Sequence, residues 1–172
     1  MSTPSLFHFR WSLPVLAELH RSGGAKFVTL AHRLGVGRET LRRTLDALVE
    51  SGLVGRNPGY GHPLRPEYVL TARGRRVGPG AARLVELLRA EGLEDVGLKK
   101  WSLPVVLELA SARRFAELRA ALRVSPRALT LALKELARAG LVERRVHDGF
   151  PPSTTYRLTG RARRLRRLAA AL

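Results

Sequence analysis

The sequence contains no cysteine. This absence excludes a disulfide framework, a thiolate zinc site and a thiol-based redox sensor. No apolar run approaches the length of a membrane span, and the first residues, Met1–Pro4, lack the apolar core of a secretory signal. The sequence therefore predicts a cytoplasmic protein with no membrane partner.

Acidic residues are scarce as well. The 172 residues include 14 Asp and Glu against 31 Lys and Arg, which gives a formal net charge of +17 at pH 7. The surplus is shared between the two halves of the chain, so it is not a basic tail. The hydrophobic content of 45% and the charged content of 26% are typical of a globular protein. A basic surplus of this size predicts a polyanionic partner.

An internal repeat divides the chain. The segment Trp11–Val15 returns unchanged as Trp101–Val105, an offset of 90 residues. From Phe27 onward the offset becomes 88 without a gap, and it pairs Leu41 with Leu129, Gly52 with Gly140 and Tyr68 with Tyr156. A repeat of this length predicts two similar domains. We place the first, with a linking helix, at residues 1–90, and the second, with a C-terminal basic helix, at residues 91–172.

The clearest helix begins after Val124. Ser125 can accept a hydrogen bond from an amide of the first turn, and Pro126 stands where its missing N–H costs nothing. Leucines at i, i+4 and i+7 then predict one buried stripe, formed by Leu129, Leu133 and Leu136. The same spacing turns a mostly basic or hydroxylic set outward, namely Arg127, Thr130, Leu131, Lys134 and Arg138. Gly140 ends this helix.

Each copy continues from this helix into a predicted hairpin. In the second copy a strand begins at Leu141, and Asp148-Gly149 marks the turn. In the first copy the helix spans about Arg38 to Glu50, with Gly37 as its cap, and the hairpin spans about Leu53 to Leu70. Helix, strand, turn and strand is the order of a winged helix. The predicted fold class is therefore mainly α with small β wings, as two tandem winged helix-turn-helix domains related by pseudo-two-fold symmetry.

Other segments complete the copies. Ser12 and Ser102 are expected to cap the first helix of each copy. Gly78-Pro79-Gly80 is expected to break the chain before an apolar helix with Leu84, Leu87 and Leu88. From Arg161 the sequence predicts an amphipathic helix with arginines on one face and Leu165, Leu168 and Leu172 on the other. Packing is favoured for that helix, while DNA backbone contact and an anionic membrane surface are alternatives.

The second copy resembles the HxlR family of bacterial winged-helix transcription regulators. The resemblance rests on Lys100-Trp101-Ser102, Ser125-Pro126-Arg127, Gly140–Arg145 and Tyr156–Thr159, and covers residues 93–165 closely and 10–77 more loosely. It implies DNA binding and a dimer built into one polypeptide. The chain departs from the pattern at Gly37-Arg38, which replaces Ser-Pro. It also departs at apolar Leu131 and Ala132, which are expected on the groove-facing surface, where polar residues are usual. Equal base reading by both halves is therefore not expected.

A helix in the major groove reads bases through long donors, whereas other cations neutralise phosphates. We therefore predict base-proximal roles for Arg42, Arg43, Arg127 and Lys134. Arg38 and Thr130 lie on the same faces. The wing residues, expected to reach backbone or minor groove, are His62, Arg65, Arg144, Arg145 and His147. The alternative for each residue is an ordinary solvated surface.

The remaining residue patterns predict no catalysis. The histidines lack metal-ligand spacing, and neither a phosphate loop nor a Ser/His/Asp motif is present, so we expect no enzyme, metal or cofactor. Trp11 and Trp101 are expected to pack in the core. The predicted partners are double-stranded DNA and a non-covalent small-molecule effector, bound by a monomeric pseudo-dimer or a homodimer. The alternative function is a tandem winged-helix module that acts through protein partners in chromosome segregation or replication assembly.

Overall fold

The computed structural model describes residues 6–57, 67–148 and 153–172. Within these ranges the chain forms two compact units, which we describe separately. The N-terminal unit comprises Phe9–Glu86. The C-terminal unit comprises residues 87–171 together with residues 6–8. The predicted domain boundary at residue 90 remains a prediction.

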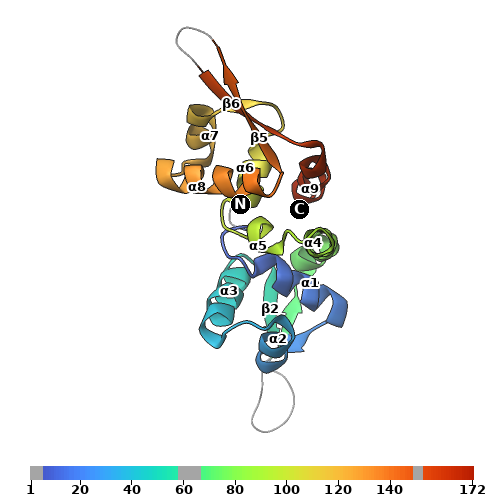
Figure 1. Ribbon diagram of the computed structural model, residues 1–172. Helices are drawn as coiled ribbons and strands as arrows, with labels where there is room; N and C mark the ends of the chain where they lie inside the picture. The colour runs from blue at the N-terminus through green and yellow to red at the C-terminus, as the bar shows by residue number, and fades with distance from the viewer. Residues whose placement is uncertain (1–5, 58–66, 149–152) are drawn as a thin grey trace. The chain divides into compact units, whose positions relative to one another are not determined.

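The N-terminal unit combines helices with a small antiparallel sheet of strand order β1-β3-β2 (Figure 1). Its elements are α1 (Ser12–Ser22), β1 (Ala25–Lys26), α2 (Phe27–Leu34), α3 (Arg38–Glu50), β2 (Val54–Asn57), β3 (Glu67–Leu70) and α4 (Ala72–Ala90), the last of which continues into the other unit. Strands β2 and β3 form the wing.

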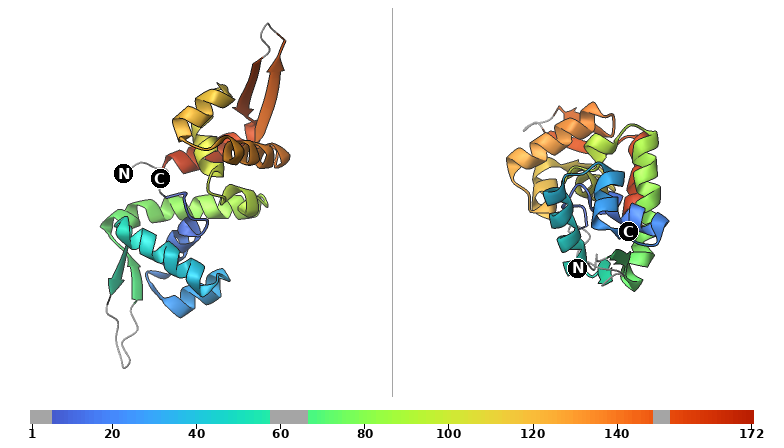
Figure 2. Two further views of the ribbon diagram at one scale, coloured as in Figure 1. Left: turned by 90° about the vertical axis from the view of Figure 1, so that its left-hand side faces the viewer. Right: turned by 90° about the horizontal axis from the view of Figure 1, so that it is seen from below.

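The C-terminal unit repeats this order, and its sheet has the equivalent strand order β4-β6-β5. Its elements are α5 (Glu94–Gly97), α6 (Ser102–Glu108), β4 (Arg113–Arg114), α7 (Phe115–Leu122), α8 (Pro126–Arg138), β5 (Val142–His147), β6 (Ser153–Leu158) and α9 (Gly160–Ala170). Figure 2 shows the β5–β6 hairpin projecting beyond the helices of its own unit. The predicted fold class, mainly α with two winged-helix domains in tandem, is confirmed.

Equivalent residues make equivalent contacts in the two units. Ala25 pairs with Tyr68 across β1 and β3, and Arg113 pairs with Tyr156 across β4 and β6, as the 88-residue offset requires. A threonine after each wing shows the same correspondence. The Oγ1 of Thr71 donates to the carbonyl of Gly52 at 2.7 Å, and the Oγ1 of Thr159 donates to that of Gly140, also at 2.7 Å. The sequence repeat is thus matched by a structural repeat in which individual hydrogen bonds recur.

The predicted leucine stripes form the core of each unit. Leu41, Leu45 and Leu48 of α3 are buried, and so are their counterparts Leu129, Leu133 and Leu136 in α8. Burying each leucine contributes about 1.5–3 kcal/mol. Ser125 caps α8 as predicted, because its Oγ accepts from the Ala128 N–H at 3.3 Å. These interactions fix which face of each helix reaches solvent.

The predicted caps of the first helices are wrong. Trp11 and Trp101 are the N-cap residues of α1 and α6, and neither makes a side-chain cap hydrogen bond. Ser12 and Ser102 lie one residue inside the helices and are buried. The tryptophans themselves are only half-buried, and the Lys100 ammonium lies 5.2 Å from the ring centroid of Trp101.

The expected break at Gly78-Pro79-Gly80 is also wrong. Helix α4 is continuous, with Pro79 inside it. An interior proline costs about 3 kcal/mol because it removes a backbone hydrogen bond. The glycines of this segment have a different role from the expected break. A Cβ on Gly74 would lie 2.0 Å from the Leu53 carbonyl oxygen, and one on Gly78 would lie 3.0 Å from Leu70. The glycines let α4 approach the wing.

Candidate nucleic-acid interface

The outer face of α8 is the first candidate surface. Arg127, Thr130 and Lys134 are exposed, as the leucine spacing predicts. Leu131 is 56% exposed, whereas Ala132 is buried, so the expectation that Ala132 belongs to the outward face is wrong. Ala132 lies next to the stripe of Leu129, Leu133 and Leu136 on the helix and is buried with these leucines in the core. Arg138 is exposed as well, so the face presents three cations, one hydroxyl and one apolar side chain.

The cations of α8 are not neutralised by carboxylates. In the ranges that the structure describes, neither Arg127 nor Lys134 forms an ion pair. The carboxylate of Glu135, on the same helix, is bound to Lys99 at 2.5 Å instead. Unpaired exposed cations attract a polyanion without first breaking an internal contact.

The equivalent face of α3 has different electrostatics. Arg38, Arg42 and Arg43 are exposed, as predicted. The Glu39 carboxylate lies 2.9 Å from the Nε of Arg43 and 3.9 Å from Nη1 of Arg42. Such exposed pairs contribute about 0–1 kcal/mol each, so a ligand can replace them. Two predicted base-reading arginines thus share one carboxylate.

Each wing follows its helix in the sequence and also contacts that helix. Arg56 of β2 is bound to Asp46 of α3 at 3.0 Å and lies 5.5 Å from the ring centroid of Tyr68. In the other unit, Arg144 and Arg145 of β5 are exposed. The Nε2 of His147 lies 2.7 Å from Thr155 Oγ1, across the hairpin. His62 and Arg65, predicted for the first wing, lie outside the described residues.

A hollow at the start of α8 adds two cations that the sequence reasoning missed. This α7–α8 hollow has a volume of about 520 Å³ and is lined by Ala116, Arg119, Ala120, Arg123, Val124 and Ser125. Arg119 and Arg123 are exposed. The hollow adjoins the N-terminal end of α8, where the helix dipole favours an anion. Its chemistry suits a phosphate group.

Arg123 also has an unusual backbone. Its φ of 49° lies in the left-handed region, and among the described residues no other non-glycine residue has a positive φ. The 88-residue offset pairs Arg123 with Gly35, whose φ is 60°, and pairs Arg119 with Ala31. An L-residue in this region costs roughly 1–2 kcal/mol. The alignment of the two copies at this offset shows arginine in place of alanine and of glycine at these two positions, and this difference could have identified both arginines from the sequence.

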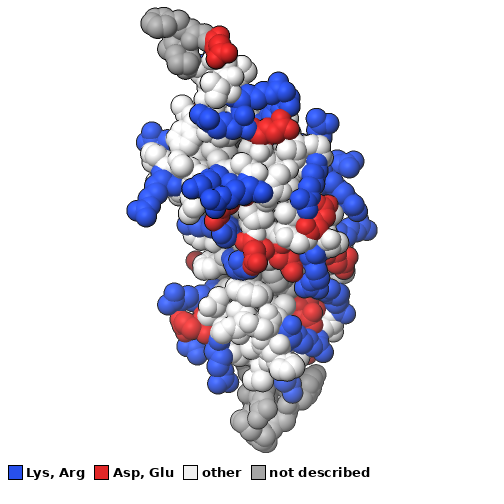
Figure 3. All heavy atoms as spheres, in the orientation of Figure 1, with Lys and Arg blue, Asp and Glu red and all other residues white. Residues whose placement is uncertain are grey.

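The described residues hold no group of three or more His, Cys, Asp or Glu side chains arranged for a metal ion. No helix among them is both long and apolar enough to cross a membrane. The pKa of His8 is lowered by partial burial and by the positive charge of Lys100. His8 belongs to the N-terminal segment and not to either helix face. The electrostatics of the surface are therefore those of its arginines and lysines, which Figure 3 shows spread over the visible face of both units.

Comparisons with known proteins agree with this geometry. Uncharacterized HTH-type transcriptional regulators of Mycobacterium tuberculosis and Mycobacterium bovis are 46% identical to the chain over 66 residues, which is 38% of the chain. The match spans only 41% of the length of those relatives.

Solved structures match about half of the chain. The redox regulator HypR in its oxidized form has 32% identity and a TM-score of 0.45, and the match covers 48% of this chain and 87% of that one. The reduced transcriptional regulator YodB from Bacillus subtilis has 27% identity and a TM-score of 0.43, with coverage of 46% and 80%.

The family comparison covers nearly the whole chain. The model of the HxlR-like helix-turn-helix family matches twice, over residues 6–92 and again over residues 96–172. The predicted resemblance, as a tandem of two copies, is confirmed. The chain belongs to the HxlR-like helix-turn-helix family.

Proposed function

We propose that this protein is a sequence-specific regulator of transcription that places α3 and α8 in major grooves of double-stranded DNA, with the wings on backbone or minor groove. The observation that carries the proposal is the exposed, unneutralised cationic face of α8. Arg127 and Lys134 lie on it, the α7–α8 hollow adjoins its first turn, and Arg144 and Arg145 follow on β5. Phosphates and base edges are the acceptors that such donors recognise.

The contacts divide by chemistry. Arg119 and Arg123 lie where a phosphate would meet the N-terminal end of α8. Arg42 and Arg43 project from α3 and have the length to reach guanine edges. Breaking their pairs with Glu39 costs little. Phosphate contacts would then be concentrated in one half-site and base contacts in the other.

Because the two copies differ in sequence, the chain has two different recognition helices, one for each half-site. Symmetric dimers read symmetric operators, because identical helices meet identical bases. The two domains of this chain are not identical, so this constraint does not apply, and the expected binding site is an imperfect inverted repeat. The reading species is a monomeric pseudo-dimer or a homodimer, and sedimentation of the DNA complex distinguishes the two. Because the chain has no cysteine, its inducer would be a non-covalent ligand, and thiol oxidants should leave DNA binding unchanged.

The first test is selection of bound duplexes from a random pool, followed by titration of the selected site at several salt concentrations. We expect an imperfect inverted repeat and an affinity that falls steeply with salt, because bound cations displace counterions from phosphates. Arg127→Ala with Lys134→Ala should lower the slope of log affinity against log salt by about 2.

The control variant is Arg164→Ala with Arg167→Ala, which removes the same charge from exposed positions of α9. It should bind the selected site with nearly the wild-type slope. Absence of binding, or a flat salt dependence, would rule out the proposal. Co-purification with a protein partner in place of DNA would then favour an assembly module.

A further inference from the structure

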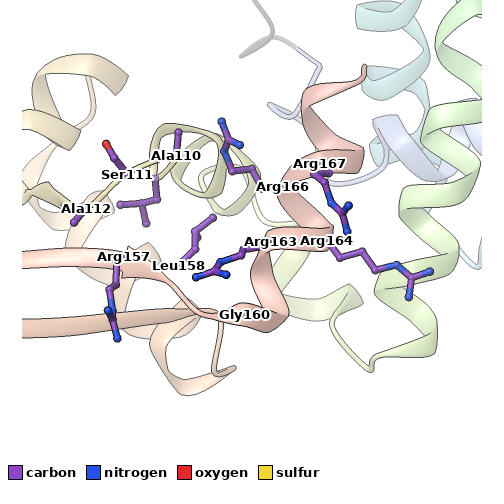
Figure 4. Close-up of a pocket in the computed structure, with 11 residues that line it drawn as sticks. Ala110, Ser111, Ala112, Arg157, Leu158, Gly160, Arg163, Arg164, Arg166 and Arg167 are labelled. Carbon is purple, nitrogen blue, oxygen red and sulfur yellow. The ribbon is translucent and has the colours of Figure 1, made fainter.

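A second basic hollow lies in the C-terminal unit, between the end of α6, the end of β6 and the first turns of α9 (Figure 4). We call it the α9 hollow. Its volume is about 680 Å³, within the range of about 300–1,000 Å³ that small-molecule sites occupy. It is lined by Leu109, Ala110, Ser111, Ala112, Arg157, Leu158, Gly160, Arg163, Arg164, Arg166 and Arg167. Five of the lining residues are arginines, and none is acidic.

The arginines differ in direction. Figure 4 shows Arg163 and Arg166 extending on the side of α9 that faces Ala110–Ala112, whereas Arg164 and Arg167 extend on the other side of the helix. The Nε of Arg166 donates to the Leu107 carbonyl at 3.5 Å, and Arg157 is bound to Glu143 at 2.6 Å. The Arg166 guanidinium is therefore held in place before any ligand arrives, whereas the charge of Arg157 is already offset by Glu143.

The wall beside these cations is apolar. Leu109 and Leu158 are buried, and Ala110 and Ala112 complete the lining on that side. Guanidinium groups bind phosphate and carboxylate oxygens in a bidentate manner, and an apolar wall accommodates the organic part of a ligand. Since no lining residue is a carboxylate, a cationic ligand is disfavoured.

We infer that the α9 hollow is an effector site for a small, multiply charged organic phosphate. This inference rests on the proposed function, because an effector presupposes a regulator. Helix α6 packs against α8 on one side and α9 on the other, within one unit. The α9 hollow is thus separate from the outer face of α8, but α6 contacts both helices. Helix α6 is the element that couples ligand binding in the hollow to DNA binding by α8.

The probe for the test is inorganic tripolyphosphate, added to the full chain at fixed ionic strength, with sulfate as the comparison anion. Calorimetric titration should give saturable binding, and the melting temperature should rise with tripolyphosphate, because a ligand of the folded state stabilises it. Arg163→Ala with Arg166→Ala should weaken tripolyphosphate binding at least about tenfold. Arg144→Ala with Arg145→Ala, the matched loss of charge from exposed positions of β5 in the same unit that do not line the hollow, should change it less than about twofold.

A third variant tests whether tripolyphosphate merely occupies the DNA surface. Arg127→Ala with Lys134→Ala should leave tripolyphosphate affinity unchanged while weakening DNA binding. Equal losses in the α9 variant and in the β5 variant would show that only the general charge of the unit attracts the anion, and would overturn the inference. So would no binding at all, or binding abolished by the α8 variant.

DNA titrations of the same proteins separate this inference from the proposed function. If the wild-type chain binds tripolyphosphate in the α9 hollow but binds no DNA, the proposed function fails and the anion site remains. If Arg163→Ala with Arg166→Ala lowers DNA affinity in the absence of tripolyphosphate, the arginines contact DNA backbone and the effector site is wrong.

Discussion

The outward faces of α3 and α8 have the same backbone and different chemistry. The 88-residue offset matches their exposed positions one to one, so that Glu39 corresponds to Arg127, Arg42 to Thr130, Arg43 to Leu131 and Asp46 to Lys134. In α3 the carboxylates of Glu39 and Asp46 each lie beside an arginine, from the same helix or from the wing. In α8 both carboxylates are replaced by cations, and both long arginines are replaced by shorter or apolar side chains.

This comparison shows that the repeat conserves the buried stripe and varies the outer face. Carboxylates that lie among arginines lower the affinity of the face for any phosphate. The arginines can still donate hydrogen bonds to a matching base, which favours discrimination between DNA sequences. Unopposed cations attract every phosphate equally and favour affinity. We therefore expect α3 to contribute mainly sequence preference and α8 mainly binding strength.

The largest effect that tests this division is expected in α3. Arg42→Ala with Arg43→Ala should relax the sequence preference in one half-site, at about 1–3 kcal/mol for each lost bidentate contact. Affinity for unrelated DNA should fall less than affinity for the selected half-site, because the lost charges and the unpaired Glu39 weaken binding to every duplex alike. The measurement is a comparison of selected and scrambled half-sites by titration.

The matched control is Arg76→Ala with Arg83→Ala, which removes two exposed arginines from α4 of the same unit. It should keep the preference for the selected half-site. If the α3 variant instead weakens all sequences uniformly, its arginines contact phosphates and the division between the helices is wrong.

Much of the fold could be predicted from the sequence because its signals are local and repeated. The leucine spacing, Ser125-Pro126 and the paired glycines fixed the bounds of α3 and α8. Strands β1 and β4 were missed because each has two residues and no periodicity. The continuity of α4 was missed because proline and glycine ordinarily interrupt a helix, whereas here Gly74 and Gly78 lie against Leu53 and Leu70, which are distant in sequence.

The candidate site was predictable as faces but not as contacts. Helical period places Arg42 and Lys134 outward without any structure. The partner of Asp46 is Arg56, ten residues away on a strand, and only the folded wing brings them together. Arg123 carries no local signal, and its backbone conformation is informative only beside Gly35. Which of these side chains contact DNA remains a prediction.

The second effect should appear at the α7–α8 hollow. Arg119→Ala with Arg123→Gly should lower affinity for every duplex and reduce the salt slope by about 2, because two phosphate contacts are lost. Glycine at position 123 removes a left-handed L-residue, so the melting temperature should not fall. Salt titrations and thermal melts of one preparation check both statements.

Arg164→Ala with Arg167→Ala is again the control, with the same charge removed from the same unit. A loss of preference for one base, with an unchanged salt slope, would show that the hollow reads sequence. In that case α8 would not be the half that supplies binding strength.

The smallest expected effect concerns Leu131, the exposed apolar residue at the position of Arg43. In a major groove its side chain can contact only the methyl group of a thymine. Replacing that thymine by uracil should weaken wild-type binding by about 0.8 kcal/mol, the contribution of one buried methyl-sized group. Leu131→Ala should bind both duplexes equally and, since Leu131 is 56% exposed, should keep the wild-type melting temperature. Scanning each thymine of the α8 half-site one at a time gives the measurement, and the same scan in the α3 half-site is the control. If no thymine responds in the wild-type protein, Leu131 does not face the groove, and the outer face of α8 holds the duplex through its cations alone.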